Sequence, residues 1–273
     1  MCAAPTLADT RPVPPLAGRM WDRAFAFWLT SYRRVWRGSL ISGFLSPVFF
    51  LAAMGFGLGS LVDAGDPGGI GSADYVAFIA PGILAAQAMQ TAVIESTYPV
   101  LGAVKWRRQY HAMLAAPLGV ADVVLGHLAF VLMRLAITSA TFLVVAWVLG
   151  AINSGWAVLG LPVAVLCGMA YAAPVFAFSA RQERDSGFAM LFRFAILPMF
   201  LFSGTFFPIE QLPAALQAVA WLTPLWHAVD LCRSLALGTA TAAAGLGHVA
   251  YLLLWVGVGV WAALRSFRRR LVV

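Results

Sequence analysis

Residues 201–235 read LFSGTFFPIEQLPAALQAVAWLTPLWHAVDLCRSL, an apolar stretch that is repeatedly interrupted. Pro208, Pro213 and Pro224 break it, because proline lacks the backbone N–H that continues a helix. The pieces that remain, 214–222 and 225–236, are too short to cross about 30 Å of hydrocarbon, which takes about 20 helical residues. We therefore predict an element that dips into the membrane and returns, or lies at one face, with its freed backbone groups buried against protein or water.

The second piece carries three polar side chains at helical spacing: His227, Asp230 and Arg233. Residues three apart lie on one face of a helix, so the three can act together. A broken element with a polar face, attached to an otherwise apolar chain, indicates a gate on a transport path. To this gate we assign Pro208, Pro213, His227, Asp230 and Arg233.

The composition favours an integral membrane protein. The chain is 62% hydrophobic and only 11% charged, with a mean hydropathy of +0.85, which leaves too much apolar surface for a soluble domain. The net charge of +7 could suggest nucleic acid, but the basic residues flank apolar segments, as membrane topology requires. The cysteines are three and not spaced as metal ligands, so we expect neither a disulfide framework nor a metal site.

We predict an all-α fold with six membrane spans. The apolar segments have the length that a bilayer requires and lie at about 40–62, 75–94, 130–151, 156–178, 187–207 and 246–264. Residues 1–18 are proline-rich and predict a disordered tail. Residues 19–38 alternate aromatic and arginine side chains, which predicts an amphipathic helix at the membrane interface; a helix packed on a soluble partner is the alternative. Residues 39–273 then form one transmembrane domain.

The distribution of basic residues predicts the orientation. Fifteen of the 18 Lys and Arg residues lie in the N-terminal segment, the 95–121 connection, the 179–186 loop and the C-terminal tail. Because such residues collect on the cytoplasmic side, we expect both termini in the cytoplasm and the 201–235 element at the outer face of the plasma membrane.

Three charged residues fall within or at the edge of predicted spans: Glu95, Arg134 and Arg193. A charge near mid-membrane costs at least about 2.5–3.5 kcal/mol on insertion scales, so such residues usually face the protein interior and pair. Pairing of Glu95 with one of the arginines is one reading, and arginines that extend to the interface are the other.

The chain contains no motif for nucleotide binding or hydrolysis. A phosphate-binding loop needs Gly-Lys before Ser or Thr, and the one lysine, Lys105, follows Val104 and precedes Trp106. We therefore expect no catalytic residue and no cofactor in this chain, with ATP and Mg²⁺ on a separate ATPase if transport is ATP-driven.

Several segments resemble the type-2 ABC exporter permeases, in the branch with nodulation-factor and daunorubicin-type drug exporters. They are FLFSGTFFP followed by QLPAALQ and TPLWHAVDLCR, AMQTAVIESTYP at 88–99, RRQYHAMLAAPLGVADVVLG at 107–126 and FSARQERDSGF at 178–188. The resemblance implies a complex of two membrane subunits, identical or homologous, with two ATPases, and export of an amphipathic drug, lipid-linked glycan or lipooligosaccharide. It does not identify the substrate.

The resemblance also implies that the segment after Arg107 is a coupling helix that rests in a groove of the ATPase. The segment is short, basic at its start and stopped by Pro117, with an apolar edge suited to docking; we assign to it Arg107, Tyr110, His111, Met113, Leu114 and Pro117. From the residues alone, an amphipathic surface helix fits equally well. A proton-coupled transporter and a membrane-embedded enzyme are the other function classes, weakened by the lack of mid-span carboxylates and of a clustered site.

Overall fold

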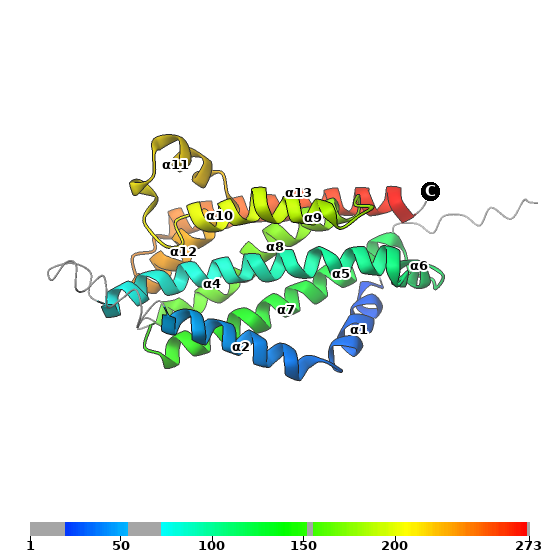
Figure 1. Ribbon diagram of the computed structural model, residues 1–273, viewed down its shortest axis with the longest axis horizontal. Coiled ribbons are helices and arrows are strands. Elements are labelled where there is room, and N and C mark those ends of the chain that lie inside the picture. Colours follow the sequence, from blue (N-terminus) through cyan, green and yellow to red (C-terminus); the bar gives the residue numbers. More distant parts are fainter. Residues whose placement is uncertain (1–19, 54–71, 152–154, 272–273) are drawn as a thin grey trace, which may run out of the picture.

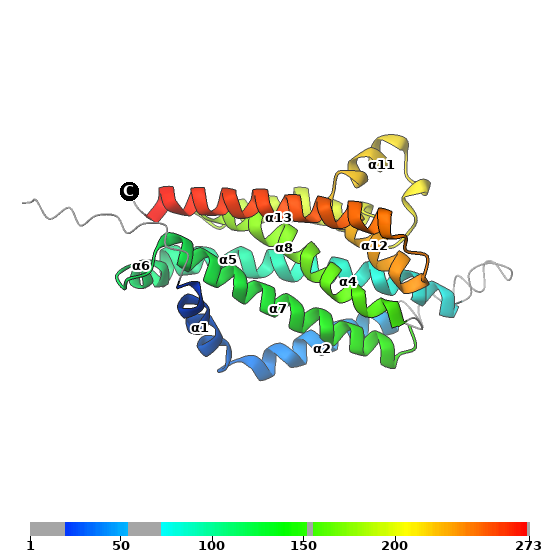
Figure 2. The ribbon, with the colours of Figure 1, turned by 180° about the vertical axis from the view of Figure 1, so that it is seen from behind.

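The computed structural model describes residues 20–53, 72–151 and 155–271, and all regular structure in them is helical. The longest helices lie side by side along the long axis of the molecule (Figures 1 and 2). The all-α fold class is thus confirmed for the part of the chain that the structure describes. The predicted tail at 1–18 lies outside these residues.

The helices follow one another in a simple order. They are α1 (Trp21–Tyr32), α2 (Trp36–Ala52), α4 (Ser72–Ser96), α5 (Tyr98–Leu101), η2 (Gly102–Trp106), α6 (Gln109–Leu114), α7 (Val120–Val148), η3 (Gly155–Leu159), α8 (Gly160–Ser179), α9 (Ser186–Leu191), η4 (Phe192–Ile196), α10 (Leu197–Phe202), η5 (Ile209–Gln211), α11 (Ala214–Trp221), α12 (Pro224–Leu237) and α13 (Ala242–Leu271).

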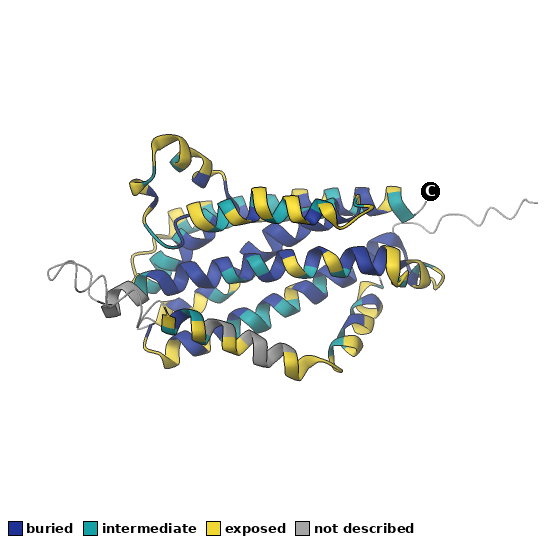
Figure 3. Ribbon diagram, viewed as in Figure 1, coloured by how far each residue is buried: buried dark blue, intermediate teal, exposed yellow. Residues whose placement is uncertain are grey.

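Helix α8 lies at the centre of the bundle and packs against α13, α4, α7 and α12. Most of its residues are buried, whereas the fifth long segment, α9 to α10, exposes one side (Figure 3). Small residues allow the close approach: a Cβ added at Gly259 of α13 would lie 2.5 Å from Pro174 Cδ of α8. The core is therefore built around α8, with the segment α9 to α10 at its margin.

Within the described ranges, four helical segments are long and apolar enough to cross a membrane: Ala77–Trp106, Val120–Val148, Gly155–Ser179 and Ala242–Leu271. The predicted fifth span is a shorter apolar helix, Ser186–Phe202. The predicted first span begins in α2, and its remainder lies outside the described residues. Six spans therefore stay a prediction.

The third predicted span begins earlier than expected, at Val120 rather than near Phe130. Asp122 ends the preceding connection: its Oδ2 accepts a bond from the Gly119 N–H at 2.9 Å, and its Oδ1 accepts one from the Met20 N–H at 2.8 Å. A carboxylate in the first helical turn satisfies free N–H groups there. The same residue therefore starts α7 and anchors the beginning of α1.

The predicted helix at 19–38 is two elements. Helix α1 ends at Tyr32, and a turn leads into α2 at Trp36. Helix α1 packs on α7, where Ala24 Cβ and the Trp21 carbonyl crowd Gly126. Trp28 is buried against protein, whereas Trp21 and Phe27 of the same helix are exposed, so only part of the aromatic set of α1 holds it to the bundle.

Candidate functional site

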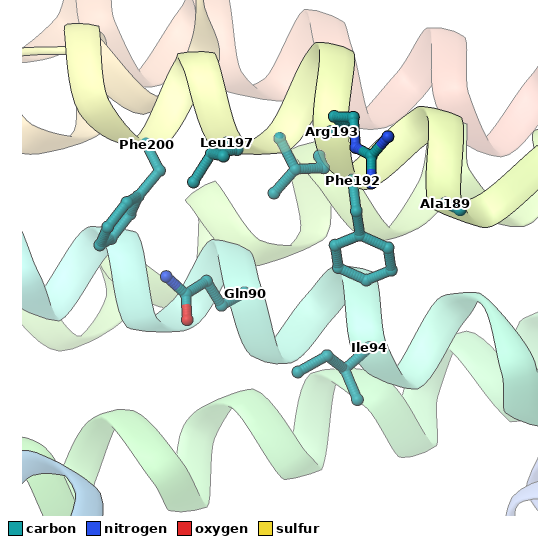
Figure 4. Close-up of a pocket in the computed structure, with 8 residues that line it drawn as sticks. Gln90, Ile94, Ala189, Phe192, Arg193, Leu197 and Phe200 are labelled. Carbon is teal, nitrogen blue, oxygen red and sulfur yellow. The ribbon is translucent and has the colours of Figure 1, made fainter.

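An open apolar groove of about 500 Å³ lies between α4 and the segment from α9 to α10. Figure 4 shows Gln90 and Ile94 of α4 across from the side chains of the opposite segment. Its walls are mainly aliphatic and aromatic, and the lining residues are Gln90, Ile94, Ala189, Phe192, Arg193, Ile196, Leu197 and Phe200. A groove of this size and chemistry can hold an apolar chain or ring system.

Arg193 is the charged residue of this groove. Sequence reasoning placed it within a span as a possible partner of Glu95, but in the described part of the chain it forms no ion pair. It is exposed beside Phe192 and Ile196. The groove thus presents a positive charge at an apolar wall, and sequence reasoning missed its other members because separate helices supply them.

Glu95 lies instead against Arg134. Arg134 Nη2 is 3.0 Å from Glu95 Oε1, and its Nε donates to the same oxygen at 3.1 Å. Arg134 Nη1 donates to Tyr32 Oη at 3.0 Å, and the guanidinium lies 4.9 Å from the Tyr32 ring centroid. Both charged side chains are less than one-fifth exposed, so this cluster joins α4, α7 and α1 through a largely buried charge pair.

The segment implied to couple to an ATPase is the short helix α6. Arg108 precedes it in the left-handed region, with φ 49°, and this turn separates η2 from α6. Tyr110 is fully buried and Met113 is 8% exposed. The prediction that Tyr110 and Met113 form an exposed docking edge is therefore wrong: the apolar side of α6 packs into the bundle, as the apolar face of a surface helix commonly does.

The Tyr110 side chain lies in a buried aromatic cluster. Its hydroxyl donates to His127 Nδ1 if that nitrogen carries no proton, and the His127 ring stacks on Trp28 with centroids 3.9 Å apart. Phe267 of α13 contacts Tyr110 edge-on, at 5.6 Å between centroids. Helices α1, α6, α7 and α13 therefore meet at this cluster.

The face of α6 that remains accessible is different from the predicted one. His111 and Pro117 are exposed and Leu114 is half-buried. Arg107 and Arg108 are exposed beside Trp106, which is 61% exposed. The exposed surface at this end, which we call the α6 surface, consists of Trp106, Arg107, Arg108, His111, Ala112 and Ala115.

The interrupted 201–235 element folds into short helices, α11 and α12, close to the predicted bounds. Pro208 and Pro213 have extended backbone ψ angles and directly precede η5 and α11. Pro224 occupies the first turn of α12. Thr223 caps α12 by accepting the Trp226 N–H at 3.3 Å. These helices lie at the end of the bundle opposite α6 and the C-terminus (Figure 1).

The three polar residues of this element separate into two groups. Arg233 Nη2 donates to the Gly204 carbonyl at 2.8 Å and its Nε to the Phe78 carbonyl at 3.2 Å. Burial lowers the pKa of Arg233 to about 10. Arg233 thus ties α12 to α4 and to the loop after α10.

His227 and Asp230 turn towards α13 and meet His248, which sequence reasoning did not select. His227 Nδ1 lies 2.9 Å from His248 Nδ1, and His248 Nε2 lies 3.3 Å from Asp230 Oδ2. The only signal in the sequence is a lone histidine in the last apolar segment, and the partner that it meets lies 21 residues away.

In the described residues, no three His, Cys, Asp or Glu side chains are grouped so that they could hold a metal ion. The described residues are helical, with four apolar segments of spanning length and an open apolar groove, and these features define a polytopic membrane protein rather than a soluble one.

Residues 22–237 match the ABC-2 type transporter family, and the chain belongs to it. Among its relatives are proteins named nodulation protein J. That of Rhizobium leguminosarum bv. trifolii is 31% identical over 253 residues, or 93% of each chain. That of R. leguminosarum bv. viciae is 32% identical over 254 residues, covering 90% of this chain and 95% of the relative. That of Rhizobium meliloti is 29% identical over 253 residues, again 93% of each. The chain is therefore the membrane subunit of an ABC exporter.

Proposed function

We propose that this permease moves an amphipathic molecule, such as a drug, a lipid-linked glycan or a lipooligosaccharide, out of the cell across the plasma membrane. The observation that carries this proposal is the groove between α4 and α9–α10. Its apolar wall suits a hydrocarbon or ring system, and the Arg193 guanidinium suits an anionic or strongly hydrogen-bonding group.

Transport is energised by ATP hydrolysis in a separate subunit, where ATP and Mg²⁺ bind. The complex contains two such ATPases and a second permease copy or homologue. The α6 surface supports this arrangement, because it presents arginines and an exposed tryptophan, the residue types enriched at protein interfaces. It is backed by the buried Tyr110 cluster, so a force on α6 reaches three other helices, α1, α7 and α13.

The proposed coupling is tested by placing a charge on the α6 surface. Ala115→Glu should leave folded yield unchanged but reduce co-purification of the ATPase and its activity in the complex at least about tenfold, because a repulsive or unpaired charge at an interface costs more than about 1.4 kcal/mol. Ala215→Glu is the matched control, since Ala215 is exposed on α11 at the other end. Equal ATPase retention by both variants would contradict coupling through α6.

The groove is tested separately. Arg193→Gln should weaken transport of anionic amphiphiles more than that of neutral ones, with ATPase binding intact. Phe192→Ala should reduce the apparent affinity for both classes through lost apolar contact, by about 5–30-fold if about 1–2 kcal/mol is lost. If both variants transported every amphiphile at the parental rate, the groove would not be the substrate path.

A further inference from the structure

A chain of hydrogen bonds crosses from α11 through α12 to α13. His227 Nε2 lies 3.0 Å from the Trp221 carbonyl, His227 Nδ1 lies 2.9 Å from His248 Nδ1, and His248 Nε2 lies 3.3 Å from Asp230 Oδ2. Each of the two imidazoles uses both ring nitrogens. We call these three side chains, His227, His248 and Asp230, the histidine clasp.

The number of protons in the clasp follows from its geometry. A carbonyl only accepts, so His227 Nε2 must carry a proton. The contact between the two Nδ1 atoms needs one proton, and so does the contact between His248 Nε2 and the carboxylate. Three contacts therefore need three protons, whereas two neutral imidazoles and a carboxylate hold two. One additional proton is required, and the complete clasp then has no net charge.

We propose that the histidine clasp binds one exchangeable proton and that loss of this proton releases α12 from α13. Without it, two lone pairs face each other across one of the contacts, and that contact must open because both atoms are acceptors. The clasp would thereby make the packing of the 201–235 element respond to pH. The proposal concerns this chain alone and holds whatever the substrate.

The surroundings place the additional proton between His248 and Asp230. Burial lowers the pKa of His227, and the repulsion of His248 lowers it further. The hydrogen bond from His248 lowers the pKa of Asp230, which favours the carboxylate. The Asp230 side chain is 50% exposed, so the proton can exchange with solvent.

The other titratable groups near the clasp form hydrogen bonds with groups outside it. The Tyr251 ring stacks on His227 at 4.0 Å while its hydroxyl donates to the Leu222 carbonyl at 2.7 Å. Tyr171 of α8 accepts the Leu225 N–H. Arg233 donates to two carbonyls, and its positive charge, after the hydrogen bond from His248, also lowers the pKa of Asp230.

The direction of the pH dependence follows. The clasp is complete above the lowered pKa of Asp230 and below the pH at which the imidazole pair loses its proton. As pH rises and the imidazole pair loses its additional proton, α12 should loosen. As pH falls through the pKa of Asp230, the carboxylate is protonated and the charge compensation is lost.

The test uses the full-length protein in lipid nanodiscs. Hydrogen exchange of the α12 amides, expressed as protection factors, should fall as pH rises. Nitrogen-15 spectra of the four histidines, assigned by single substitutions, should show one clasp imidazole with both nitrogens protonated at the low end. Asp230→Asn should move the midpoint of both changes to lower pH, by about one unit, because the compensating charge is gone.

Two further variants separate titration from simple packing. His248→Phe keeps a ring but removes two contacts, so α12 should exchange rapidly at every pH. Tyr251→Phe removes a hydrogen bond that involves no imidazole, from α13 to the end of α11, and should retain the pH dependence. The proposal is overturned if protection of α12 in the parental protein does not change with pH, or if both clasp imidazoles are neutral while α12 is protected.

Discussion

Glu95 and Arg134 form a largely buried charge pair at the junction of α1, α4 and α7. Such a pair adds little net stability over an apolar equivalent, yet removing one partner is costly, about 3–5 kcal/mol in buried sites. We expect Glu95→Gln to lower the folded yield clearly, because Arg134 then loses the carboxylate that it binds through two nitrogens.

A double-mutant cycle in detergent measures this coupling. Thermal unfolding of Glu95→Gln, Arg134→Met and the double variant should show that the double change costs less than the sum of the single ones. Tyr32→Phe is the control, since it keeps the ring under the guanidinium and removes only one hydrogen bond, worth about 1 kcal/mol. Strictly additive costs would mean that the arginine is stabilised independently of Glu95.

Tyr110 belongs to the core of the protein rather than to its docking surface. Tyr110→Ala should destabilise the bundle by about 3 kcal/mol or more, because a fully buried aromatic ring and a buried hydrogen bond are lost. Tyr110→Phe should cost far less, since it keeps the ring contacts with Trp28 and Phe267. Size-exclusion profiles and unfolding curves check both. A Tyr110→Ala protein that is as stable as the parent would contradict the buried placement.

Single residues also show which side-chain contacts could not be predicted from the sequence. The acids and bases near spans could be selected because charge in hydrocarbon is costly. The sequence could not predict whether Tyr110 faces inward, because a short amphipathic helix has the same sequence pattern whether its apolar side docks on a partner or packs on its own bundle. His248 could not be selected for the opposite reason: alone in an apolar segment, it carries no local signal of its contacts on α12.

At the scale of elements, the prolines predicted α11 and α12 almost to the residue, because proline acts locally through a missing N–H and a fixed φ. The start of α7 was misplaced by about ten residues, since hydropathy ignores the cap that Asp122 provides. The break between α1 and α2 was also missed. Helix ends are set by such local hydrogen bonds, which a hydrophobic pattern does not record.

Close packing of α8 and α13 makes a sharp prediction at this scale. Gly259→Ala would bring a Cβ within 2.8 Å of the Pro174 backbone nitrogen, and backbone cannot rotate away as a side chain can. We expect a loss of about 1–3 kcal/mol from overpacking. Gly257→Ala, two residues earlier in the same helix, has open space and should be neutral or slightly stabilising, since alanine favours the helix. Unfolding temperatures of the two variants give the comparison, and equal values would argue against this helix crossing.

At the scale of the whole molecule, the two ends of the bundle differ in charge. The C-terminal arginines, the α6 surface and the loop with Arg184 lie at one end, and the 201–235 element lies at the other (Figures 1 and 2). The positive-inside rule acts on such an asymmetry during insertion. On this rule we expect the α6 end in the cytoplasm, on the side of the proposed ATPase.

Cysteine labelling in intact cells tests this orientation. The starting protein carries Cys2→Ser, and its remaining thiols, Cys167 and Cys232, are buried. Glu210→Cys should react with a membrane-impermeant maleimide, whereas Arg184→Cys and Arg269→Cys should react only after the cells are permeabilised. All three positions are exposed, so a difference in reaction reports the side of the membrane rather than burial. Labelling of Arg184→Cys but not Glu210→Cys in intact cells would invert the assignment, placing the α6 surface outside and removing the basis for ATPase coupling through it.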